Sequence, residues 1–235
     1  IIVDASEVSE MLDDVIAGRL TISDQAITVT GEISANEARE LSETTSGLLT
    51  ATISDTAIAE LEALPLFAEN DLTIRLTDSS VEAIDLIYLG FRTSLPIASS
   101  EVTEIIGQFG DIYHAYRGMN DQFTGIEDAN LTVTEDLNVF MANVLDTDIT
   151  TGTIAGSITS ETVETLKTLT GVNAYNITIN AADATSTTAA DLNEINALTS
   201  VPVNLTNVTA LAASSLSDLA ILQAAITDNE FSNAT

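Results

Sequence analysis

The chain has 235 residues, of which 45% are hydrophobic, so it is long enough to bury a sizeable core. Six Lys and Arg against 36 Asp and Glu leave a formal net charge of −30, which excludes a basic surface for nucleic acid or anionic lipid. With no cysteine and one histidine, the sequence also excludes disulfides, cysteine nucleophiles and multi-histidine metal sites, and it leaves a serine triad only His114 as its base. No apolar run approaches the ~18 residues of a membrane span.

Short alternating runs rich in Thr, Val and Ile predict β-strands, because β-branched side chains fit a pleated surface. A polar turn and an amphipathic stretch of about ten to fourteen residues follow each run, which predicts a helix after each strand. In chain order the predicted strands cover residues 27–30, 48–54, 72–76, 96–98, 131–133, 151–158, 176–180 and 201–205.

Many of the predicted helices open on a Ser or Thr with an acidic residue three positions later, the spacing of a capping box. Each box stabilises its helix by about 1 kcal/mol, so much of the negative charge has a structural reason. The predicted boxes are Ser34 with Glu37, Ser79 with Glu82, Thr132 with Glu135, Thr188 with Asp191 and Ser215 with Asp218. A further helix is predicted over 101–116, where Gly107 and Gly110 indicate close packing or a kink.

Nine dipeptides place a polar residue, usually an acid, directly before an aliphatic residue of buried type. Their aliphatic members lie 30, 20, 25, 19, 32, 29, 26 and 27 residues apart, a mean period of about 26. We interpret each aliphatic residue as a core position that marks the register of a repeat. The dipeptides are Glu10-Met11, Glu40-Leu41, Glu60-Leu61, Asp85-Leu86, Glu104-Ile105, Asp136-Leu137, Thr165-Leu166, Asp191-Leu192 and Asp218-Leu219.

This periodicity predicts an α/β fold of stacked supersecondary units. Strands that are separated by helices run parallel, and their crossovers are right-handed. We therefore expect a leucine-rich-repeat-like solenoid of about nine strand–turn–helix repeats, forming a single segment over 1–235 of a longer chain. Thr and Asn side chains on the exposed face of its sheet are expected to form hydrogen-bonded ladders.

The predicted register breaks between Tyr88 and Phe123, which enclose six of the ten aromatic residues and the one histidine. Residues 107–130 are interpreted as an insertion or a degenerate repeat. Within it, Phe109, Tyr113 and Tyr116 are spaced as a packing stripe on one helix. Alternatively, Tyr88, Tyr113 and Tyr116 form an exposed patch that binds a glycan or a protein.

Two kinds of carboxylate chemistry are compatible with so acidic a chain. Calcium is the one cofactor considered, with candidate oxygen ligands in acidic turns at Asp146 and Asp148 and at Glu127 and Asp128. The alternative is that these acids are solvated turn and cap residues. Hydrolysis by paired acids would need two carboxylates that face each other in a cleft. No pair stands out among so many acids, and the sequence predicts that the protein is not an enzyme.

Three segments resemble the repeat tracts of giant secreted and cell-surface proteins of marine cyanobacteria and related bacteria. They are 49–56 (LTATISDT), 171–179 (GVNAYNITI) and 189–203 (AADLNEINALTSVPV). The family is S-layer-like or adhesin-like and is often linked to haemolysin-type calcium-binding repeats. The glycine-rich calcium nonapeptide of those proteins is missing from this chain, so the resemblance transfers no calcium ligand.

The resemblance and the repeat pattern together favour an extracellular structural protein at the cell surface. We expect a stiff spacer, or a lattice or filament subunit of an S-layer or matrix, that self-associates or stacks against neighbouring domains of the same long chain. The alternative is an adhesin-type module that uses the aromatic region 88–123 to bind a cell-surface glycan or a protein. Neither nucleic acid nor direct membrane insertion is expected.

Overall fold

The computed structural model describes residues 1–66, 70–119, 121–148 and 152–234 and has an α/β fold with parallel sheets. The chain forms two compact units. Unit 1 comprises Ile1–Ile105 and His114–Glu127, and unit 2 comprises Ile106–Tyr113 and Asp128–Thr235. The chain passes from one unit to the other within or beside the predicted irregular segment 107–130. Whether 1–235 is a single solenoid segment stays a prediction.

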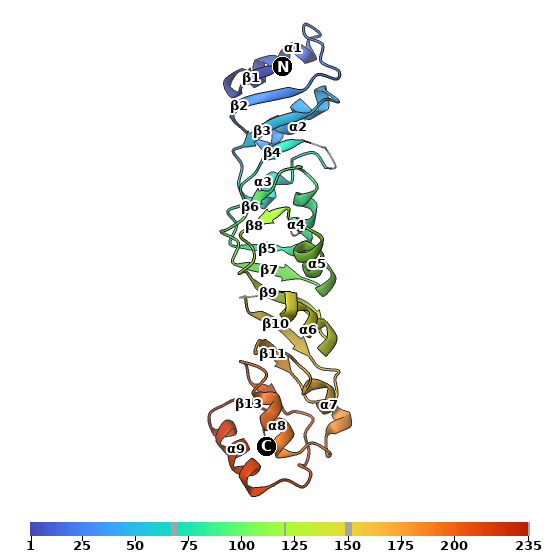
Figure 1. The fold of residues 1–235 in the computed structure, drawn as a ribbon, viewed down its shortest axis with the longest axis vertical. Helices are drawn as coiled ribbons and strands as arrows, with labels where there is room; N and C mark the ends of the chain where they lie inside the picture. The colour runs from blue at the N-terminus through green and yellow to red at the C-terminus, as the bar shows by residue number, and fades with distance from the viewer. Residues whose placement is uncertain (67–69, 120, 149–151, 235) are drawn as a thin grey trace. The chain divides into compact units, whose positions relative to one another are not determined.

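In unit 1, strands and helices alternate along the chain from β1 to β4, and these four strands lie side by side in chain order (Figure 1). Its elements are β1 (Ile2–Asp4), η1 (Ala5–Glu7), α1 (Val8–Ile16), β2 (Ile27–Ile33), α2 (Ala35–Thr44), β3 (Leu49–Ile53), α3 (Ile58–Leu61), β4 (Asp71–Thr73), β5 (Ser80–Glu82), α4 (Ala83–Gly90), β6 (Ile97–Ala98), the π-helical segment η2 (His114–Gly118) and β8 (Phe123–Thr124). Strand β7 (Glu104–Gly107) is divided between the two units.

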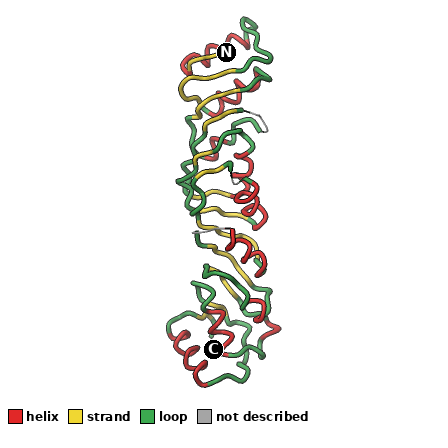
Figure 2. The backbone as a smooth tube through the Cα atoms, viewed as in Figure 1, coloured by secondary structure: helices red, strands yellow, loops and turns green. Residues whose placement is uncertain are grey.

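Unit 2 repeats the alternation of strand and helix, which Figure 2 shows by colour. Its elements are α5 (Phe109–Tyr113), β9 (Asn130–Asp136), α6 (Val139–Asp148), β10 (Ile154–Ile158), α7 (Val163–Leu166), β11 (Ala174–Ile177), η3 (Ala181–Asp183), α8 (Ala189–Asn196), β12 (Val203–Asn204), α9 (Leu216–Thr227) and β13 (Phe231–Ser232).

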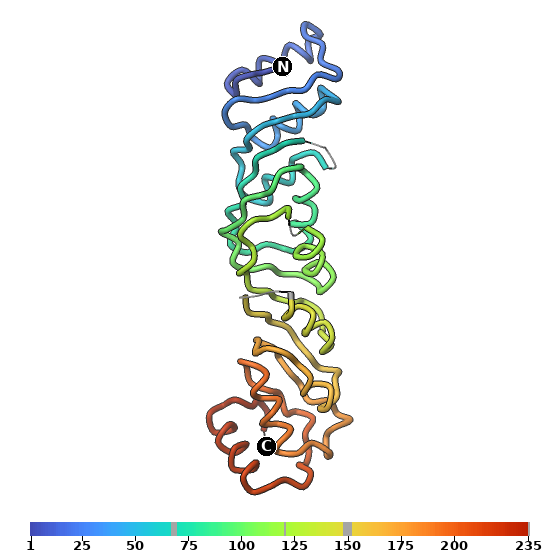
Figure 3. The backbone as a smooth tube through the Cα atoms, in the orientation of Figure 1, coloured from blue at the N-terminus to red at the C-terminus, as the bar shows by residue number. Residues whose placement is uncertain are grey.

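Within each unit, neighbouring strands pair in parallel, as predicted. Paired residues are between 19 and 28 positions apart, from Ala155 with Ala174 to Val203 with Phe231. Each strand–helix segment therefore brings the chain back beside the strand of a neighbouring segment, and Figure 3 traces this path through each unit. All eight predicted strands overlap an observed one, although Thr151 lies outside the described residues. Strands β1, β5, β7, β8 and β13 were missed.

The prediction of one long sheet is not confirmed, because the strands of the described residues fall into four separate sheets of four, five, two and two strands. The strands are short, from two to seven residues. Between separate sheets, isolated bridges such as Arg75 with Ala98 and Thr178 with Asn204 take the place of a continuous ladder. The pairing register also shifts within the two larger sheets, between Thr28 and Glu32 and between Ala155 and Ser157.

The aliphatic member of each polar–aliphatic pair was predicted to be a core residue, and eight of the nine are buried. Two of them are not helical, because Ile105 lies in β7 and Leu137 directly follows β9. The exception is Leu219 of α9, which is 37% exposed. Helix α9 also exposes 87% of Leu216, and Leu222 is its one buried residue, so the amphipathic pattern predicted for the helices does not describe this one.

Three of the five predicted capping boxes lie at the first turn of an observed helix, and the cap bond forms in each. Ser34 with Glu37 and Thr188 with Asp191 each make both reciprocal bonds, and Ser215 accepts from the Asp218 amide. The other two predicted boxes are wrong, because Thr132 and Glu135 lie in strand β9, and Glu82 ends strand β5 just before α4. A strand directs alternate side chains to opposite faces, so residues three apart cannot close a box there.

A second form of capping was not predicted. The first backbone amide of a helix donates a hydrogen bond to a side chain that lies 20 to 26 residues further along the chain. In unit 1, Asp55 Oδ2 accepts from Ala35 N of α2 at 2.7 Å, and Asp78 Oδ2 from Ile58 N of α3 at 2.8 Å. In unit 2 the same bond joins Glu135 to Phe109, Glu161 to Val139, Asp183 to Val163 and Ser214 to Ala189, at 2.8 to 3.1 Å. Six helices of the described residues are therefore capped by the following strand–helix segment.

Buried amide and hydroxyl side chains also join successive segments. Asn70 accepts from Leu49 N, and Thr93 accepts from Leu72 N at 2.9 Å and donates to Leu72 O at 2.7 Å. Asn173 plays the same part in unit 2, accepting from Ile154 N. Each of these three side chains is at most 5% exposed. The prediction that Asn and Thr side chains form ladders on an exposed sheet face is therefore wrong for Asn70, Thr93 and Asn173. Their side chains are buried and bond to the backbone of the preceding segment.

The predicted helix over 101–116 is also wrong in its first half. Residues 104–107 form β7 instead, because Glu104-Ile105-Ile106-Gly107 alternates half-buried and buried positions as a strand does. Gly110 does lie in a helix, but nothing approaches within 4 Å of where its Cβ would be, so close packing does not explain it. Within the described ranges, no helix is both long and apolar enough to cross a bilayer.

Candidate functional site

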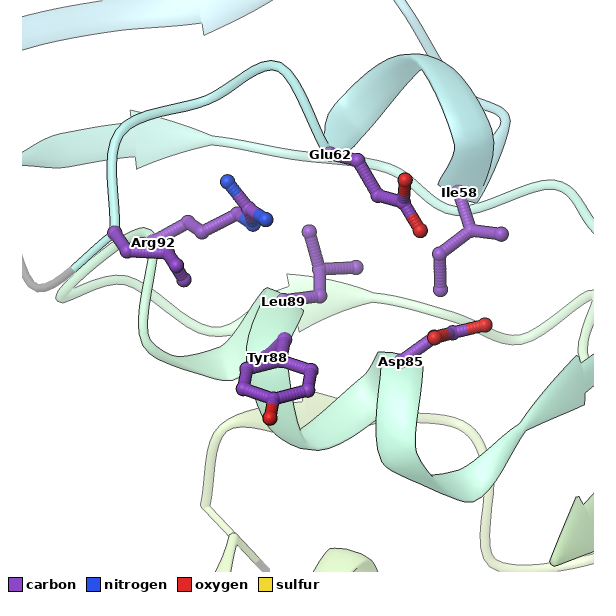
Figure 4. A pocket seen from close by; sticks show the side chains of 7 residues that line it. Ile58, Glu62, Asp85, Tyr88, Leu89 and Arg92 are labelled. Atoms are coloured by element: carbon purple, nitrogen blue, oxygen red, sulfur yellow. The ribbon is translucent and has the colours of Figure 1, made fainter.

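Helices α3 and α4 of unit 1 enclose a cavity of about 300 Å³ that combines charged and apolar side chains. Ile58 comes from α3 and Glu62 from the residue that ends it. Helix α4 and the turn after it contribute Asp85, Tyr88, Leu89 and Arg92, and Leu66 completes the lining (Figure 4). We call this the α3–α4 cavity.

The sequence of α4 explains why these four side chains share one side of the cavity. Asp85, Tyr88, Leu89 and Arg92 are spaced by three, one and three residues, which places them on one helical face. The opposite face of α4 carries the fully buried core residues Ala83 and Leu86. Asp85 is also one of the nine polar–aliphatic pairs, so the same register that buries Leu86 turns the carboxylate toward the cavity.

The electrostatics of the cavity are set by two carboxylates and one guanidinium. Burial raises the pKa of Asp85 above its ordinary value, and the nearby charge of Glu62 adds to the rise. Burial lowers the pKa of Arg92, against the attraction of Glu62. Arg92 is 7% exposed and donates from Nη1 to the carbonyl of Leu64, so its hydrogen-bonding capacity is partly used within the fold.

Two further cavities lie in unit 2. One of about 160 Å³ is lined mainly by aliphatic side chains of α8, α9 and the segment between them, among them Leu192, Leu205 and Leu222. The other, of about 490 Å³, is larger but lies among turn residues such as Ser200, Asn229 and Glu230. The α3–α4 cavity differs from both because two carboxylates and a buried guanidinium line it together with aliphatic side chains.

The three tyrosines predicted as a ligand patch have different surroundings. Tyr88 is 47% exposed and lines the α3–α4 cavity. Tyr116, also in unit 1, is half-buried and donates its hydroxyl to the carbonyl of Ile126 at 2.8 Å. Tyr113 belongs to unit 2, is 39% exposed and stacks on Phe109 with ring centroids 5.8 Å apart. The structure therefore brings Tyr88 alone to the cavity.

The residues predicted to bind calcium do not form a recognisable metal centre. No group of three or more His, Asp or Glu side chains is placed for a metal anywhere in the described ranges. Asp146 accepts from Asn173 Nδ2 at 2.9 Å, while Glu127 and Asp128 lie exposed in a turn. The side chain of Asp148 lies outside the described residues. Calcium binding stays a prediction.

The sequence did not single out Glu62, Asp85 and Arg92 as a group. One signal was available, because Asp85 is the only charged residue in the otherwise apolar helix Ala83–Gly90. Glu62 comes from a segment more than 20 residues earlier, so only the fold brings the two carboxylates to one cavity.

The chemistry of the cavity follows from these groups. Two carboxyl groups at one cavity, one of them with a raised pKa, are also found in acid–base catalysis, but the other described lining residues are aliphatic side chains, Tyr88 and the buried Arg92, and they include no Ser, Thr, Cys, Lys or His. The arrangement suits the binding of a cation better than the turnover of a substrate. Comparison of the chain with protein-family models, with curated proteins and with solved structures finds no match in any of the three.

Proposed function

We propose that this chain is an extracellular structural protein, a stiff repeat spacer or a lattice or filament subunit at the cell surface. In this proposal its strand–helix segments form a leucine-rich-repeat-like solenoid of about nine repeats, part of an S-layer-like or matrix assembly. Its partners are further copies of itself or neighbouring domains of the same long chain.

The observation that carries the proposal is the capping of helices by the following segment. Asp55 bonds to α2, Asp78 to α3, and four equivalent side chains bond to α5, α6, α7 and α8. A repeat array is stabilised by the interface of each unit with its neighbour. When a segment moves away from the one before it, it must break a hydrogen bond from a backbone amide to a capping side chain. In five of the six caps that side chain is a carboxylate, which adds a charge–dipole attraction, and these bonds resist bending.

Imaging tests the proposed assembly. The native material is examined by cryo-electron microscopy in millimolar calcium and in chelator, and layers or filaments with a constant repeat are expected in at least one condition. Isolated particles of one chain in every condition contradict the lattice proposal. A melting curve in the same two solutions tests calcium separately, since a structural calcium ion raises the melting temperature and an absent one leaves it unchanged.

Mechanical unfolding tests the spacer proposal independently of assembly. The chain is held at both ends and stretched, and the force at which segments of unit 1 open is compared between the wild type and Asp78→Ala. A lower force is expected for the variant, and Asp13→Asn serves as the control, because Asp13 is exposed on α1 and has no side-chain bond among the described residues. Equal forces in all three proteins contradict the proposed role of the caps.

A second candidate function is an adhesin-type binding module. The observation that favours it is the exposure of Tyr88 beside a cavity of about 300 Å³. A glycan array probed with the wild type and with Tyr88→Ala tests it. If the wild type binds a glycan and Tyr88→Ala does not, the result supports the adhesin proposal. If the wild type binds no glycan on the array, glycans are excluded as its ligands.

A further inference from the structure

We propose that the α3–α4 cavity binds a primary ammonium group carried on an unbranched aliphatic chain, as in a lysine side chain. The proposal goes beyond the structural role and does not depend on it. It rests on the size of the cavity, on the apolar character of its walls and on the two carboxylates that share it.

The size of the cavity limits the ligand to a small one. Its volume of about 300 Å³ lies at the lower end of the range for small-molecule sites. Ile58, Leu66 and Leu89 provide aliphatic walls, which favour burial of methylene groups. An extended polar chain such as an oligosaccharide would leave its hydroxyl groups without partners against these walls. One linear alkyl chain fits both the volume and the lining.

The charge of the cavity selects a cation. Neither Glu62 nor Asp85 has a hydrogen bond or salt bridge to another described residue, and Figure 4 shows both side chains at the same cavity. An ammonium group placed near both would relieve the repulsion and the loss of solvation that raise the pKa of Asp85. Arg92 attracts Glu62, and the three groups together carry a formal net charge of −1. The overall charge of −30 attracts further cations from solution.

Other charged ligands fit less well. An anion would approach two carboxylates, while the guanidinium that could hold it is buried and already donates to Leu64. A calcium ion takes six to eight oxygen ligands, whereas this cavity presents two carboxylates among aliphatic walls. An ammonium group needs three acceptors at most, and the exposed ring of Tyr88 at the cavity adds a cation–π contact.

Calorimetric titration of the whole chain tests the proposal with N-acetyl-lysine methylamide as the probe. Saturable binding is expected, with a dissociation constant on the order of 1 mM for so small a ligand. The norleucine analogue, which keeps the alkyl chain but lacks the ammonium, is expected to bind about ten-fold more weakly or not at all. Equal binding of the two compounds, or no binding of the lysine compound, overturns the proposal.

Variants locate the site. Asp85→Asn and Glu62→Gln are each expected to weaken binding of the lysine compound about ten-fold. Glu60→Gln is the matched control, because Glu60 is exposed on α3 and does not line the cavity, and its affinity should stay within about two-fold of the wild type. An equal loss in Glu60→Gln overturns the site, since it would show attraction by net charge alone. Circular dichroism verifies that each variant is folded.

A second series distinguishes the source of the amine. The free diamine 1,5-diaminopentane is compared with a short peptide that presents one lysine side chain. If both bind and compete, the cavity accepts a lysine from a partner protein, and if the diamine alone binds, its ligand is a free alkylamine. If calcium chloride at equal ionic strength displaces the lysine compound while sodium chloride does not, the cavity is a divalent-cation site and the proposal is wrong.

Discussion

Removal of the Asp78 carboxylate should destabilise helix α3 more than any other single change of a surface acid in unit 1. Helix α3 spans only Ile58–Leu61, and Ala57 at its N-cap makes no side-chain bond. The carboxylate of Asp78, which accepts from Ile58 N at 2.8 Å, is therefore the one side-chain acceptor at this helix start among the described residues. Loss of a helix cap costs about 1 kcal/mol, and loss of the charge–dipole attraction adds about 0.3 to 1 kcal/mol.

We therefore expect Asp78→Ala to lower the free energy of unfolding of unit 1 by about 1 to 2 kcal/mol. Asp78→Asn keeps an acceptor oxygen but removes the charge, so about half of that loss is expected. Asp55→Ala removes the equivalent bond at α2, but the capping box of Ser34 and Glu37 remains, and the loss should be smaller than for Asp78→Ala.

Hydrogen–deuterium exchange provides the sharpest readout, because it reports the Ile58 amide itself. Protection of the α3 amides should fall about ten-fold in Asp78→Ala, together with a lower midpoint of urea unfolding. Asp13→Asn removes one negative charge at an exposed position and should change neither quantity. If Asp78→Ala and Asp13→Asn behave alike, capping by the following segment does not stabilise the fold and the reasoning is refuted.

Three further predictions concern packing and charge. Leu192→Ala, at a fully buried position, should cost about 2 to 5 kcal/mol in urea unfolding, whereas Leu219→Ala at the equivalent position of α9 should cost less than about 1 kcal/mol, since Leu219 is 37% exposed. Gly47→Ala should cost about 1 to 3 kcal/mol in the same assay, because its Cβ would lie 2.5 Å from the backbone of the preceding turn. Burial raises the pKa of Asp191, but hydrogen bonds, the strongest of them from Lys167, have a larger opposite effect and hold this pKa below its ordinary value. The ionised carboxylate therefore stabilises the fold at any pH above the ordinary pKa of an aspartate. This stability is lost as the pH falls through the lower pKa of the folded protein. Lys167→Met should therefore lower the melting temperature at pH 7 and flatten its dependence on pH between about 5 and 2, and an unchanged profile would contradict this.

Periodicity was the reliable signal in this sequence, because burial is periodic. The spacing of Leu41, Leu61, Leu86 and Leu192 predicted core positions that are fully buried, and it predicted the parallel pairing of strands about one period apart. It failed at Leu219, because α9 is apolar around most of its circumference and its sequence does not indicate which face turns inward.

Contacts between segments could not be predicted in the same way. Glu135 illustrates this, since its spacing from Thr132 is that of a capping box, yet both residues lie in β9 and the carboxylate accepts from Phe109 N, 26 residues earlier. A cap within one helix depends on a spacing of three residues, which a sequence displays. A cap across segments depends on the register of two strands and on the length of the turn between them, which the sequence leaves open. The same limit applies to Glu62 and Asp85 at the α3–α4 cavity.

The distribution of acids has a consequence for their roles. Where a carboxylate caps its own helix, as Glu37 does, its removal weakens one element. Where it caps the preceding helix, as Asp55, Asp78 and Asp183 do, its removal weakens an interface, and the energy is shared by two segments. Acids of this second kind place negative charge at the positive ends of helices, so a chain with a net charge of −30 offsets part of its self-repulsion at these interfaces. In the α3–α4 cavity, by contrast, Glu62 follows the end of α3 and Asp85 lies in the first turn of its own helix α4, so neither carboxylate joins two segments as a cap.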